Sequence, residues 1–350
     1  MNTTKTNIKN LVRPNVKRMK PYASARDEYK GSVNNMVFLD ANENPFENGV
    51  NRYPDTQQTR LKSILATERN VSIDNILIGN GSDEVLDLIF RAFCEPNQDN
   101  IITLPPTYGM YEVLANINAV DVLEVSLSSV FQPLVKNVLD KQNNNSKLLF
   151  ICSPNNPTAN SFDKDKIETL INNFYGIVVI DEAYIDFSEE ESWLCRLNKF
   201  PNLIVTQTLS KAYGMAGIRL GICYASAEII SVLNKIKPPY NVNTLTEQKA
   251  IGQLSDRKIV EAQVELLKTQ RKLLRIELEN IDFIETIYPS DANFLLIKVD
   301  DASKRYNQLL KKGIVIRNRS TQHLCENCIR ITVGTPQENQ ELINILKTLT

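Results

Sequence analysis

Histidine is almost absent from this sequence, because His323 is the only one among 350 residues. A metal site built from several histidines is therefore impossible. A serine–histidine or cysteine–histidine mechanism would have to use His323, and no nucleophile-elbow pattern accompanies it. If the protein is an enzyme, we expect its proton-transfer group to be something other than histidine.

Three further features are missing from the chain. The 40 lysines and arginines balance 41 aspartates and glutamates, so the basic excess of most nucleic-acid-binding proteins is absent. No apolar run is long enough to span a bilayer. The amino terminus has no continuous apolar core of the kind that marks a secretory signal. We therefore expect neither a nucleic-acid partner nor a membrane association.

The six cysteines are mostly scattered, which favours reduced thiols in a cytoplasm over a disulfide framework. Cys325 and Cys328 form a C-x-x-C pair close to His323. A zinc site would normally need a second close pair, and the sequence has none. We interpret both residues as buried thiols next to an apolar strand, with a metal or redox role as the alternative.

What the sequence does contain is a lysine in an unusual setting, within the stretch Thr208–Gly221 (TLSKAYGMAGIRLG). Lys211 follows Ser210 and precedes a run of small and apolar residues. Such surroundings lower the pKa of a lysine and supply the neutral amine that carbonyl chemistry needs. Ser210 and Arg219 could together hold a phosphate. An amine beside a phosphate site points to pyridoxal phosphate held as a Schiff base. The alternative is a loop lysine in an ion pair.

A second candidate anion site follows the strand predicted over residues 75–78. Residues 79–84 form a glycine-rich turn before a predicted helix over 85–93, and backbone amides at a helix start bind anions. Glu84 stands where a dinucleotide fingerprint requires glycine, so a single phosphate is a better ligand than NAD. The alternative is a tight turn that only caps the helix.

Asp181 ends an apolar strand predicted over residues 177–180, so we expect its side chain to be buried. A buried aspartate needs a cationic or strong donor partner. A pyridine nitrogen can be that partner, because a carboxylate keeps it protonated and the ring electron-withdrawing. A structural salt bridge is the alternative.

Apolar runs alternate with helical segments through the first two thirds of the chain, which indicates a mainly parallel sheet covered on both faces. The runs lie at residues 37–39, 75–78, 101–104, 120–125, 148–151, 177–180 and 203–205. A smaller unit follows, with a long helix over 257–280, strands over 293–299, 314–316 and 329–333, and a capping box that starts the last helix at Thr335.

Three motifs in this order, SPNNPT, VVIDEAYIDF and TLSKAYGMAGIRLG, resemble those of fold-type I pyridoxal-phosphate aminotransferases. More narrowly, LDANENPF, NRYPD, PPTYGMYEV and IRITVGT are similar to segments of the histidinol-phosphate aminotransferase family. The resemblance implies an α/β fold with a large cofactor-binding domain over residues 31–245 and a small α/β domain over 246–350. It also implies an N-terminal arm over 1–30 that packs with the small domain.

The resemblance assigns a role to each matching residue around the cofactor ring. Lys211 would be the Schiff-base lysine and proton carrier, and Asp181 would pair with the pyridine nitrogen. Asn156 and Tyr184 would bond the phenolic oxygen, and Tyr108 would stack on the ring.

The resemblance also implies which residues bind the anionic groups of the cofactor and the substrates. The cofactor phosphate would be surrounded by Ser82, Asp83, Ser210 and Arg219. Tyr53 would reach the phosphate site of a neighbouring subunit, which makes the enzyme a homodimer. Arg330 would bind the carboxylate of the glutamate co-substrate, with Arg317 and Tyr22 near the same anion site.

One position departs from the family pattern, because Ala159 stands where the loop usually has glycine. If this residue has a positive φ, alanine costs about 1 kcal/mol. Asn160 tolerates the left-handed region better, so the turn could instead shift by one residue.

Together these features predict an aminotransferase of histidine biosynthesis that converts L-histidinol phosphate and 2-oxoglutarate to imidazole-acetol phosphate and L-glutamate. The reaction would be a reversible ping-pong transfer through Lys211. The alternatives are an aromatic aminotransferase, a threonine-phosphate decarboxylase and a catalytically silent cofactor-binding regulator.

Overall fold

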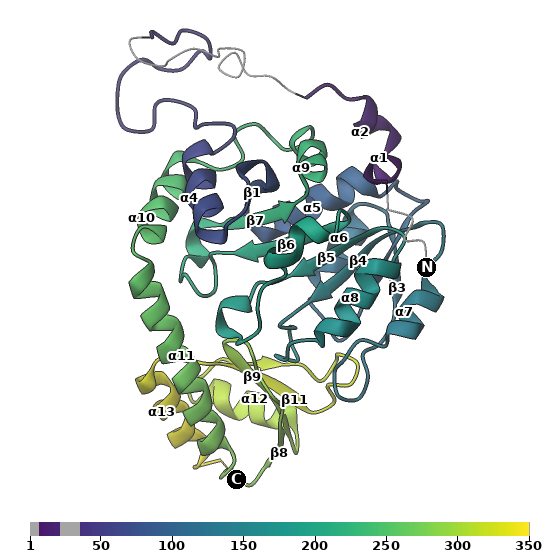
Figure 1. Cartoon of the computed structure of the whole chain (residues 1–350). Helices are drawn as coiled ribbons and strands as arrows, with labels where there is room; N and C mark the ends of the chain where they lie inside the picture. The colour runs from purple at the N-terminus through teal and green to yellow at the C-terminus, as the bar shows by residue number, and fades with distance from the viewer. Residues whose placement is uncertain (1–6, 22–35, 350) are drawn as a thin grey trace.

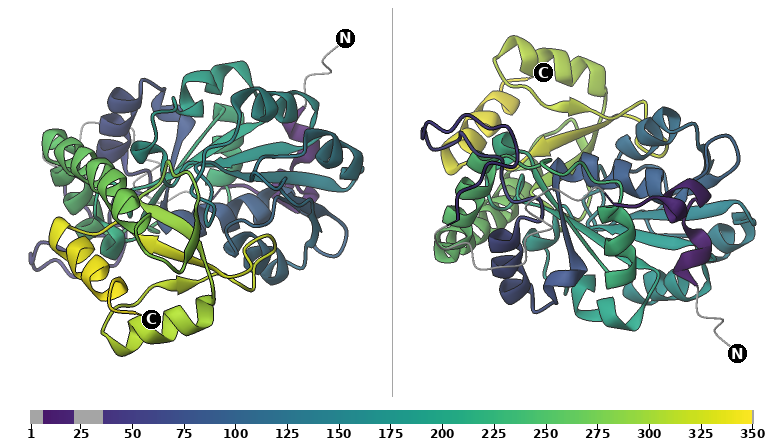
Figure 2. Two further views of the ribbon diagram at one scale, coloured as in Figure 1. Left: turned by 90° about the horizontal axis from the view of Figure 1, so that it is seen from below. Right: turned by 90° about the horizontal axis from the view of Figure 1, so that it is seen from above.

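The computed structural model describes residues 7–21 and 36–349 and folds them into a larger and a smaller body (Figure 1). The larger body contains a seven-stranded sheet, and the smaller body, at the bottom of Figure 1, contains a four-stranded sheet. The two further views in Figure 2 show the small body set against one side of the large one. The predicted α/β class is confirmed. Tyr22 lies outside the described residues.

The large sheet is mainly parallel, as predicted, and its strand order is β1-β7-β6-β5-β4-β2-β3. Only β7 runs against its neighbours β6 and β1. The strands are β1 (Ile76–Asn80), β2 (Asn100–Thr103), β3 (Asp121–Glu124), β4 (Ser146–Cys152), β5 (Ile177–Asp181), β6 (Leu203–Thr208) and β7 (Leu220–Ala225). The sequence expectations do not include β7. It is antiparallel because the loop that carries Lys211 returns directly to the sheet without a crossover helix.

Helices cover both faces of this sheet and bury the alternating side chains of its strands. They are α4 (Thr59–Arg69), α5 (Gly81–Phe93), α6 (Met110–Ile117), α7 (Val135–Lys141), α8 (Lys164–Asn173), α9 (Ala227–Asn234) and α10 (Thr244–Leu254). Short 3-10 turns add η1 (Ile73–Asn75), η2 (Ile185–Phe187), η3 (Trp193–Lys199) and η4 (Ala216–Ile218). In β5, Ile177 and Val179 pack with α5, α6 and α9, whereas Val178 and Ile180 pack with α4, α7 and α8. This two-sided burial explains the continuous apolar run of the strand.

The predicted strand at residues 37–39 does not form. Residues 36–53 instead run as an extended segment at the top of Figure 1, beyond the sheet. Val37 and Leu39 are 80% and 87% exposed, so their apolar side chains have no core to join in this chain.

The described part of the N-terminal arm, residues 7–21, packs on the large body, whereas the sequence predicts that the arm packs with the small domain. This part contains α1 (Ile8–Leu11) and α2 (Pro14–Arg18). Ile8 and Val16 are buried in the apolar layer that α5 forms on the large sheet. The Arg13 amide donates to the Ala92 carbonyl at the end of α5 at 3.0 Å. The arm's few apolar residues therefore find their partners on the large sheet.

The small body is an antiparallel sheet with three helices. Its strand order is β10-β11-β9-β8, and the strands are β8 (Ile284–Ile287), β9 (Phe294–Val299), β10 (Arg317–Asn318) and β11 (Cys328–Thr332). The helices are α11 (Arg257–Leu278), α12 (Ala302–Lys311) and α13 (Pro336–Leu346). The capping box predicted at Thr335 is confirmed, with Glu338 as its second member. The strand expected over 314–316 starts later, at Arg317.

The long helix α11 connects the two bodies (Figure 1). Val260 and Val264 near its start belong to the core of the large sheet, whereas Leu274 and Leu278 near its end belong to the core of the small sheet. The preceding helix α10 also belongs to the large core, through Ala250. We therefore propose a domain boundary within α11 and not at residue 246. In the described ranges, no helix is long and apolar enough to cross a membrane.

Candidate active site

A cavity of about 500 Å³ opens where the parallel strands end and the small sheet begins. It contains every predicted site residue except Tyr22, which is not described, and Tyr53. The predicted residues that line it are Ser82, Asp83, Tyr108, Asn156, Asp181, Tyr184, Ser210, Lys211, Arg219, Arg317 and Arg330. Parallel strands present their carboxyl ends at one edge of a sheet, so loops that are distant in sequence meet there.

Lys211 lies in the loop between β6 and β7 and extends into this cavity. Its Nζ atom is 5.7 Å from the centre of the Tyr184 ring. Burial and the nearby charge of Arg330 lower the pKa of Lys211, while Asp181 opposes this shift. None of the ion pairs in the described part of the chain involves Lys211. A loop lysine in an ion pair is therefore not what the geometry shows.

Asp181 ends β5 and is buried, with 4% of its surface exposed, as expected. The Tyr111 hydroxyl donates to its Oδ2 at 2.9 Å, and the Ala183 amide donates to its Oδ1 at 3.1 Å. Burial raises the pKa of Asp181, and these two donors oppose the rise. Within the described ranges no lysine or arginine pairs with it, so the salt-bridge alternative is not observed. Hydrogen-bond donors thus stabilise the carboxylate, which also lines the cavity and has no cationic partner among the described residues.

The start of helix α5 forms a close-fitting anion cradle with Arg219. Gly81 has a φ of +79°, and a Cβ atom there would lie 2.6 Å from Nη2 of Arg219. A Cβ on Gly221 would lie 2.3 Å from the backbone nitrogen of Ser82. Both glycines are therefore needed for the approach of β7 and Arg219 to the first turn of the helix. The free amides of that turn and the guanidinium together favour a phosphate.

Asp83 connects this cradle to Tyr108. Its carboxylate lies 3.5 Å from Nη2 of Arg219 and accepts a 3.2 Å hydrogen bond from the Tyr108 hydroxyl. The ring of Tyr108 packs edge-to-face on Tyr111, with centroids 5.6 Å apart. These contacts hold the Tyr108 ring at the cavity wall.

Asn156 and Tyr184 connect the large sheet to the small one. Nη1 of Arg330 donates to Oδ1 of Asn156 at 2.5 Å. The Tyr184 ring packs edge-to-face on Phe294 of β9, with centroids 5.1 Å apart. In the following loop Ala159 has a φ of +68°, so alanine itself takes the left-handed conformation and the turn does not shift to Asn160.

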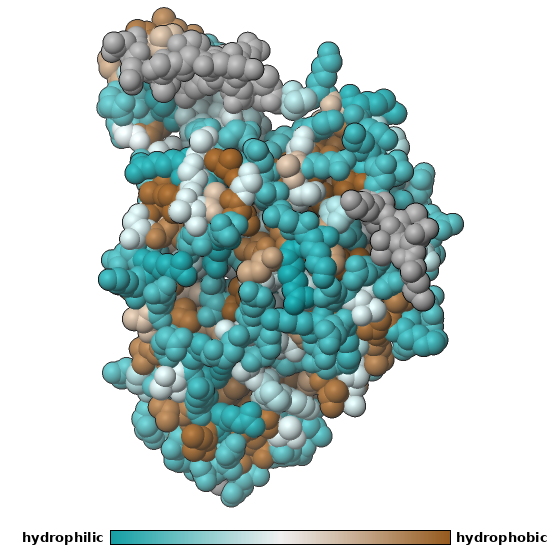
Figure 3. Space-filling view, in the orientation of Figure 1, coloured by the Kyte–Doolittle hydropathy of each residue, from teal (hydrophilic) through white to brown (hydrophobic). Residues whose placement is uncertain are grey.

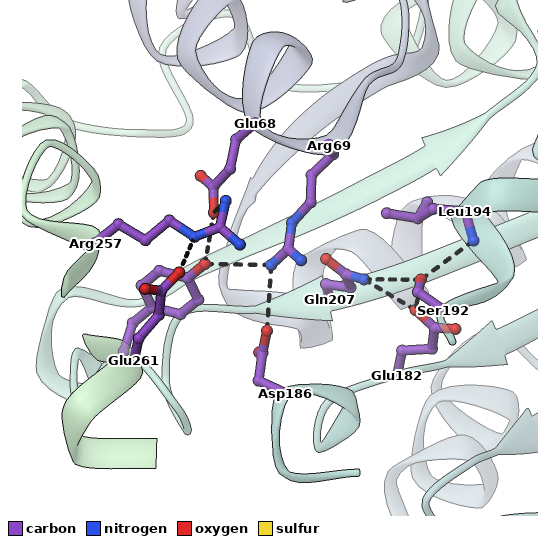
Figure 4. Close-up of polar contacts among 10 residues, drawn as sticks. Glu68, Arg69, Glu182, Asp186, Ser192, Leu194, Gln207, Arg257 and Glu261 are labelled. Carbon is purple, nitrogen blue, oxygen red and sulfur yellow. Dashed lines mark hydrogen bonds and ion pairs between the residues drawn. The ribbon is translucent and has the colours of Figure 1, made fainter. Parts of the chain in front are cut away.

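A polar network behind the lysine loop joins α4, η2 and α11 (Figure 4). Tyr213, two residues after Lys211, donates to Glu68 at 2.9 Å and accepts from Arg69 at 3.3 Å. Arg69 also contacts Asp186 at 3.4 Å, and Glu68 lies 3.9 Å from Arg257 of α11. The loop after Lys211 is thereby anchored to α4 and η2, and through Glu68 to the start of α11.

Figure 4 also shows how the carboxylate next to Asp181 is satisfied. Glu182 is buried and accepts hydrogen bonds from Ser192, the Trp193 amide and Gln207. Burial raises the pKa of Glu182, and these donors oppose the rise. Glu182 therefore holds the end of β5 in place, while Asp181 is left to face the cavity.

The cysteine pair carries no metal site in the described residues, where no group of three or more histidine, cysteine or acidic side chains could hold an ion. All six cysteines are unpaired. Cys325 and Cys328 are buried, as expected, and His323 is exposed.

Comparison with known proteins identifies the family that this geometry belongs to. Residues 28–346 match the model of the aminotransferase class I and II family. The chain belongs to this family. A histidinol-phosphate aminotransferase from Flavobacterium psychrophilum is 62% identical, over 98% of this chain and 99% of its own length.

Solved structures of other family members are similar to this aminotransferase. The histidinol-phosphate aminotransferase from Clostridium acetobutylicum is 26% identical, with a TM-score of 0.79 over 85% of this chain and 90% of its own. The enzyme of the same name from Sinorhizobium meliloti, solved in complex with pyridoxal-5'-phosphate, is 22% identical. It has a TM-score of 0.76 over 85% of this chain and 84% of its own, which shows the shared fold.

The cavity of this aminotransferase fits pyridoxal phosphate on three counts. The cradle at the start of α5 suits a phosphate, and Lys211 offers an amine of lowered pKa. Asp181 offers a buried carboxylate that no cation of the described chain neutralises. A protonated pyridine ring would supply that cation.

Sequence reasoning missed several residues of the site. Tyr111, which supports Asp181, is one, and three cavity residues are others: Thr208, Arg319 and Gln322. Arg319 follows Arg317 by two residues, and side chains two apart on a strand share a face. This alternation is the signal that could have identified Arg319.

Proposed function

We propose that this protein is a pyridoxal-phosphate-dependent histidinol-phosphate aminotransferase. It transfers the amino group of L-histidinol phosphate to 2-oxoglutarate and forms imidazole-acetol phosphate and L-glutamate. The observation that carries the proposal is the 62% identity to a histidinol-phosphate aminotransferase over essentially the full length of both chains. The cavity supports it, because Arg219 lies at the end formed by the large sheet, and Arg317 and Arg330 lie at the end formed by the small sheet. Two anionic groups, one of the cofactor and one of the substrate, can therefore be bound.

Each residue of the cavity has a defined part in this proposal. When bound, pyridoxal phosphate supplies a conjugated ring that takes up the electron pair left when Cα of the substrate loses its proton. Lys211 would hold the cofactor and carry that proton, since its lowered pKa favours the neutral amine. Asp181 would pair with the ring nitrogen, and the Tyr111 hydroxyl holds its carboxylate in place.

The remaining side chains orient the two ligands. The first turn of α5, Ser210 and Arg219 hold the cofactor phosphate. Asn156 and Tyr184 would bond the phenolic oxygen of the ring, and Tyr108 would stack on it. Arg330 and Arg317 bind the anionic group of each substrate in turn, since a guanidinium fork matches a carboxylate or a phosphate. Asn156 also fixes Arg330 through its 2.5 Å hydrogen bond.

The direct test is glutamate formation by the purified holoenzyme from L-histidinol phosphate and 2-oxoglutarate. L-phenylalanine and L-tyrosine test the aromatic alternative, and carbon dioxide release from O-phospho-L-threonine tests the decarboxylase. We expect the highest kcat/KM with L-histidinol phosphate. A higher value with either rival would overturn the substrate assignment, and no turnover with any would favour the regulator.

We further propose that the enzyme is a homodimer in which Tyr53 reaches the cavity of the partner. Tyr53 lies outside the cavity of its own chain and stacks on Tyr240, with centroids 4.5 Å apart. The segment before it exposes Val37, Leu39 and Phe46, each at least 80%. Figure 3 shows some brown, apolar atoms at the top edge of the molecule, among teal, polar residues. Exposed apolar residues of this kind are typical of a surface that another chain covers.

Refolding two impaired variants together tests the shared site. Lys211→Ala and Tyr53→Ala are denatured, mixed in equal amounts and refolded. If Tyr53 serves the partner, a mixed dimer has one intact site, so about a quarter of all sites regain activity. If Tyr53 serves its own chain, no mixed site is intact and mixing restores nothing.

We also place the enzyme in the cytoplasm, in line with its six unpaired cysteines.

A further inference from the structure

We propose that Arg319 is a specificity-determining residue that recognises the doubly charged phosphate of the amino donor and contributes little to binding of the carboxylate co-substrate. The inference rests on the function proposed above. It concerns a residue at the small-sheet end of the cavity, on the hairpin formed by β10 and β11.

The hairpin brings three arginines to one side of the small sheet. Arg317 lies directly opposite Arg330 in the register of β10 and β11. The Arg319 amide donates to the Cys328 carbonyl at 2.8 Å and so continues this pairing beyond β10. Arg317 and Arg319 are two residues apart, and opposite residues of paired strands share a face. All three side chains accordingly line the cavity.

These three arginines have no acidic partner among the described residues. Two arginines elsewhere in the chain do have one: Arg305 pairs with Asp300 at 2.6 Å, and Arg69 with Asp186 at 3.4 Å. Burial and then the charge of Arg317 lower the pKa of Arg319. Three like charges in one cavity repel one another, and a bound anion of charge −2 relieves more of this repulsion than a single carboxylate.

Three polar atoms of the same loop are buried without a hydrogen-bond partner in the described structure. They are Nε of Arg319, Oγ of Ser320 and Oε1 of Gln322, and Arg319 and Gln322 line the cavity. A buried N–H without an acceptor costs free energy, so a ligand that supplies one gains affinity. Because no acceptor of the described chain bonds this Nε, the guanidinium of Arg319 is not held there by a protein group, which suits a side chain that meets a ligand anion.

The two substrates differ in how many such contacts they can use. Arg330, fixed by Asn156, offers a fork that satisfies the two oxygens of one carboxylate. A phosphate monoester presents a third oxygen and a second charge, and Arg319 is a further cation, beyond Arg330 and Arg317, that lines this end of the cavity and can meet them. Its contribution is thus larger for L-histidinol phosphate than for L-glutamate.

The experiment measures the two half-reactions separately on the holoenzyme, by single-turnover changes in cofactor absorbance. The variants are Arg319→Gln and the conservative Arg319→Lys. The matched control is Arg275→Gln, which removes an exposed arginine of α11 that pairs with Glu279 at 3.5 Å. L-histidinol phosphate, unphosphorylated L-histidinol and L-glutamate are the amino donors. Retained cofactor absorbance and melting temperature show that each variant is folded.

We expect Arg319→Gln to lower kcat/KM for L-histidinol phosphate by roughly 10- to 100-fold, the value of a hydrogen bond to a charged group. The constants for L-histidinol and L-glutamate should change little, Arg319→Lys should lie between, and Arg275→Gln should match the wild type. Equal losses with all three donors would overturn the inference, and so would no loss with the phosphorylated one.

A binding measurement separates failure of this inference from failure of the proposed function. Inorganic phosphate should raise the melting temperature of the wild-type holoenzyme more than that of Arg319→Gln. If the wild type does not turn over L-histidinol phosphate, the proposed function is wrong, and this phosphate effect alone decides the role of Arg319. Equal phosphate effects in both proteins would then overturn it.

Discussion

Replacing Tyr111 with phenylalanine tests whether a neighbouring hydroxyl keeps the buried Asp181 charged. Tyr111 is fully buried, and its hydroxyl donates to Oδ2 of Asp181 at 2.9 Å. Its ring stacks on Phe150, with centroids 4.7 Å apart and planes at 17°, and phenylalanine keeps that packing. The substitution therefore removes one donor from a buried carboxylate and little else.

The expected effect depends on pH. A hydrogen bond to a charged group contributes about 1.5–3 kcal/mol, and one to a neutral group about 1 kcal/mol. Burial raises the pKa of Asp181, so the folded protein loses stability as pH rises from the pKa of the unfolded carboxyl toward that of the folded one. Without the Tyr111 donor this pKa rises further. The free energy of unfolding should fall by about 1.5–3 kcal/mol at neutral pH, and by less in acid.

Urea unfolding of the cofactor-free protein at neutral and mildly acidic pH measures this difference. The matched control is Tyr224→Phe, because Tyr224 is equally buried and its hydroxyl makes no hydrogen bond to a carboxylate in the described structure. Equal losses at both pH values in Tyr111→Phe would show that the hydroxyl does not act through the charge of Asp181. In the holoenzyme, the acid limb of kcat/KM should move to higher pH.

The other predictions concern the lysine and the anion cradle. Lys211→Ala should lower glutamate formation by at least about 10²–10⁴-fold, because it removes the proton carrier. Its circular dichroism should not change, because Lys211 makes no ion pair in the described structure. Gly221→Ala should lower the free energy of unfolding by about 1–3 kcal/mol in urea and weaken cofactor binding, since its Cβ would meet the backbone of Ser82. Gly252→Ala, in the open interior of α10, is its control and should be stabilising by about 0.5–1 kcal/mol. An unaffected Gly221→Ala protein would mean that the close approach to α5 is not required.

The parts of this fold that the sequence predicts are those with a local signal. The alternation of apolar runs and helices predicts the parallel strands, and the turn residues after each strand predict the loops of the cavity. Asp181 is an example, since its place at the end of a continuous apolar strand already requires burial. Thr335 is another, because a capping box needs only four consecutive residues.

The parts that could not be predicted depend on contacts between distant segments. β7 follows the lysine loop so closely that its apolar run reads as a continuation of the motif, and only its pairing with β6 and β1 defines it. The support that Tyr111 gives to Asp181 comes from a helix 70 residues away. The place of the arm's described part is likewise set by distant contacts, because Ile8 and Val16 belong to the cluster that α5 forms on the large sheet.

The reactivity of Lys211 is a property of the assembled cavity and not of its motif alone. Burial is the largest cause of its lowered pKa. The next cause is Arg330, which comes from the small sheet, and Asp181 at the end of β5 acts in the opposite direction. Arg330 of the small body thus lowers the pKa of the Lys211 amine, and Asp181 of the large body raises it. The polar network that anchors Tyr213 to α4 and α11 fixes the lysine loop between them. An isolated large domain would keep the motif and the carboxylate but lose the cation, so its lysine would hold its proton more tightly.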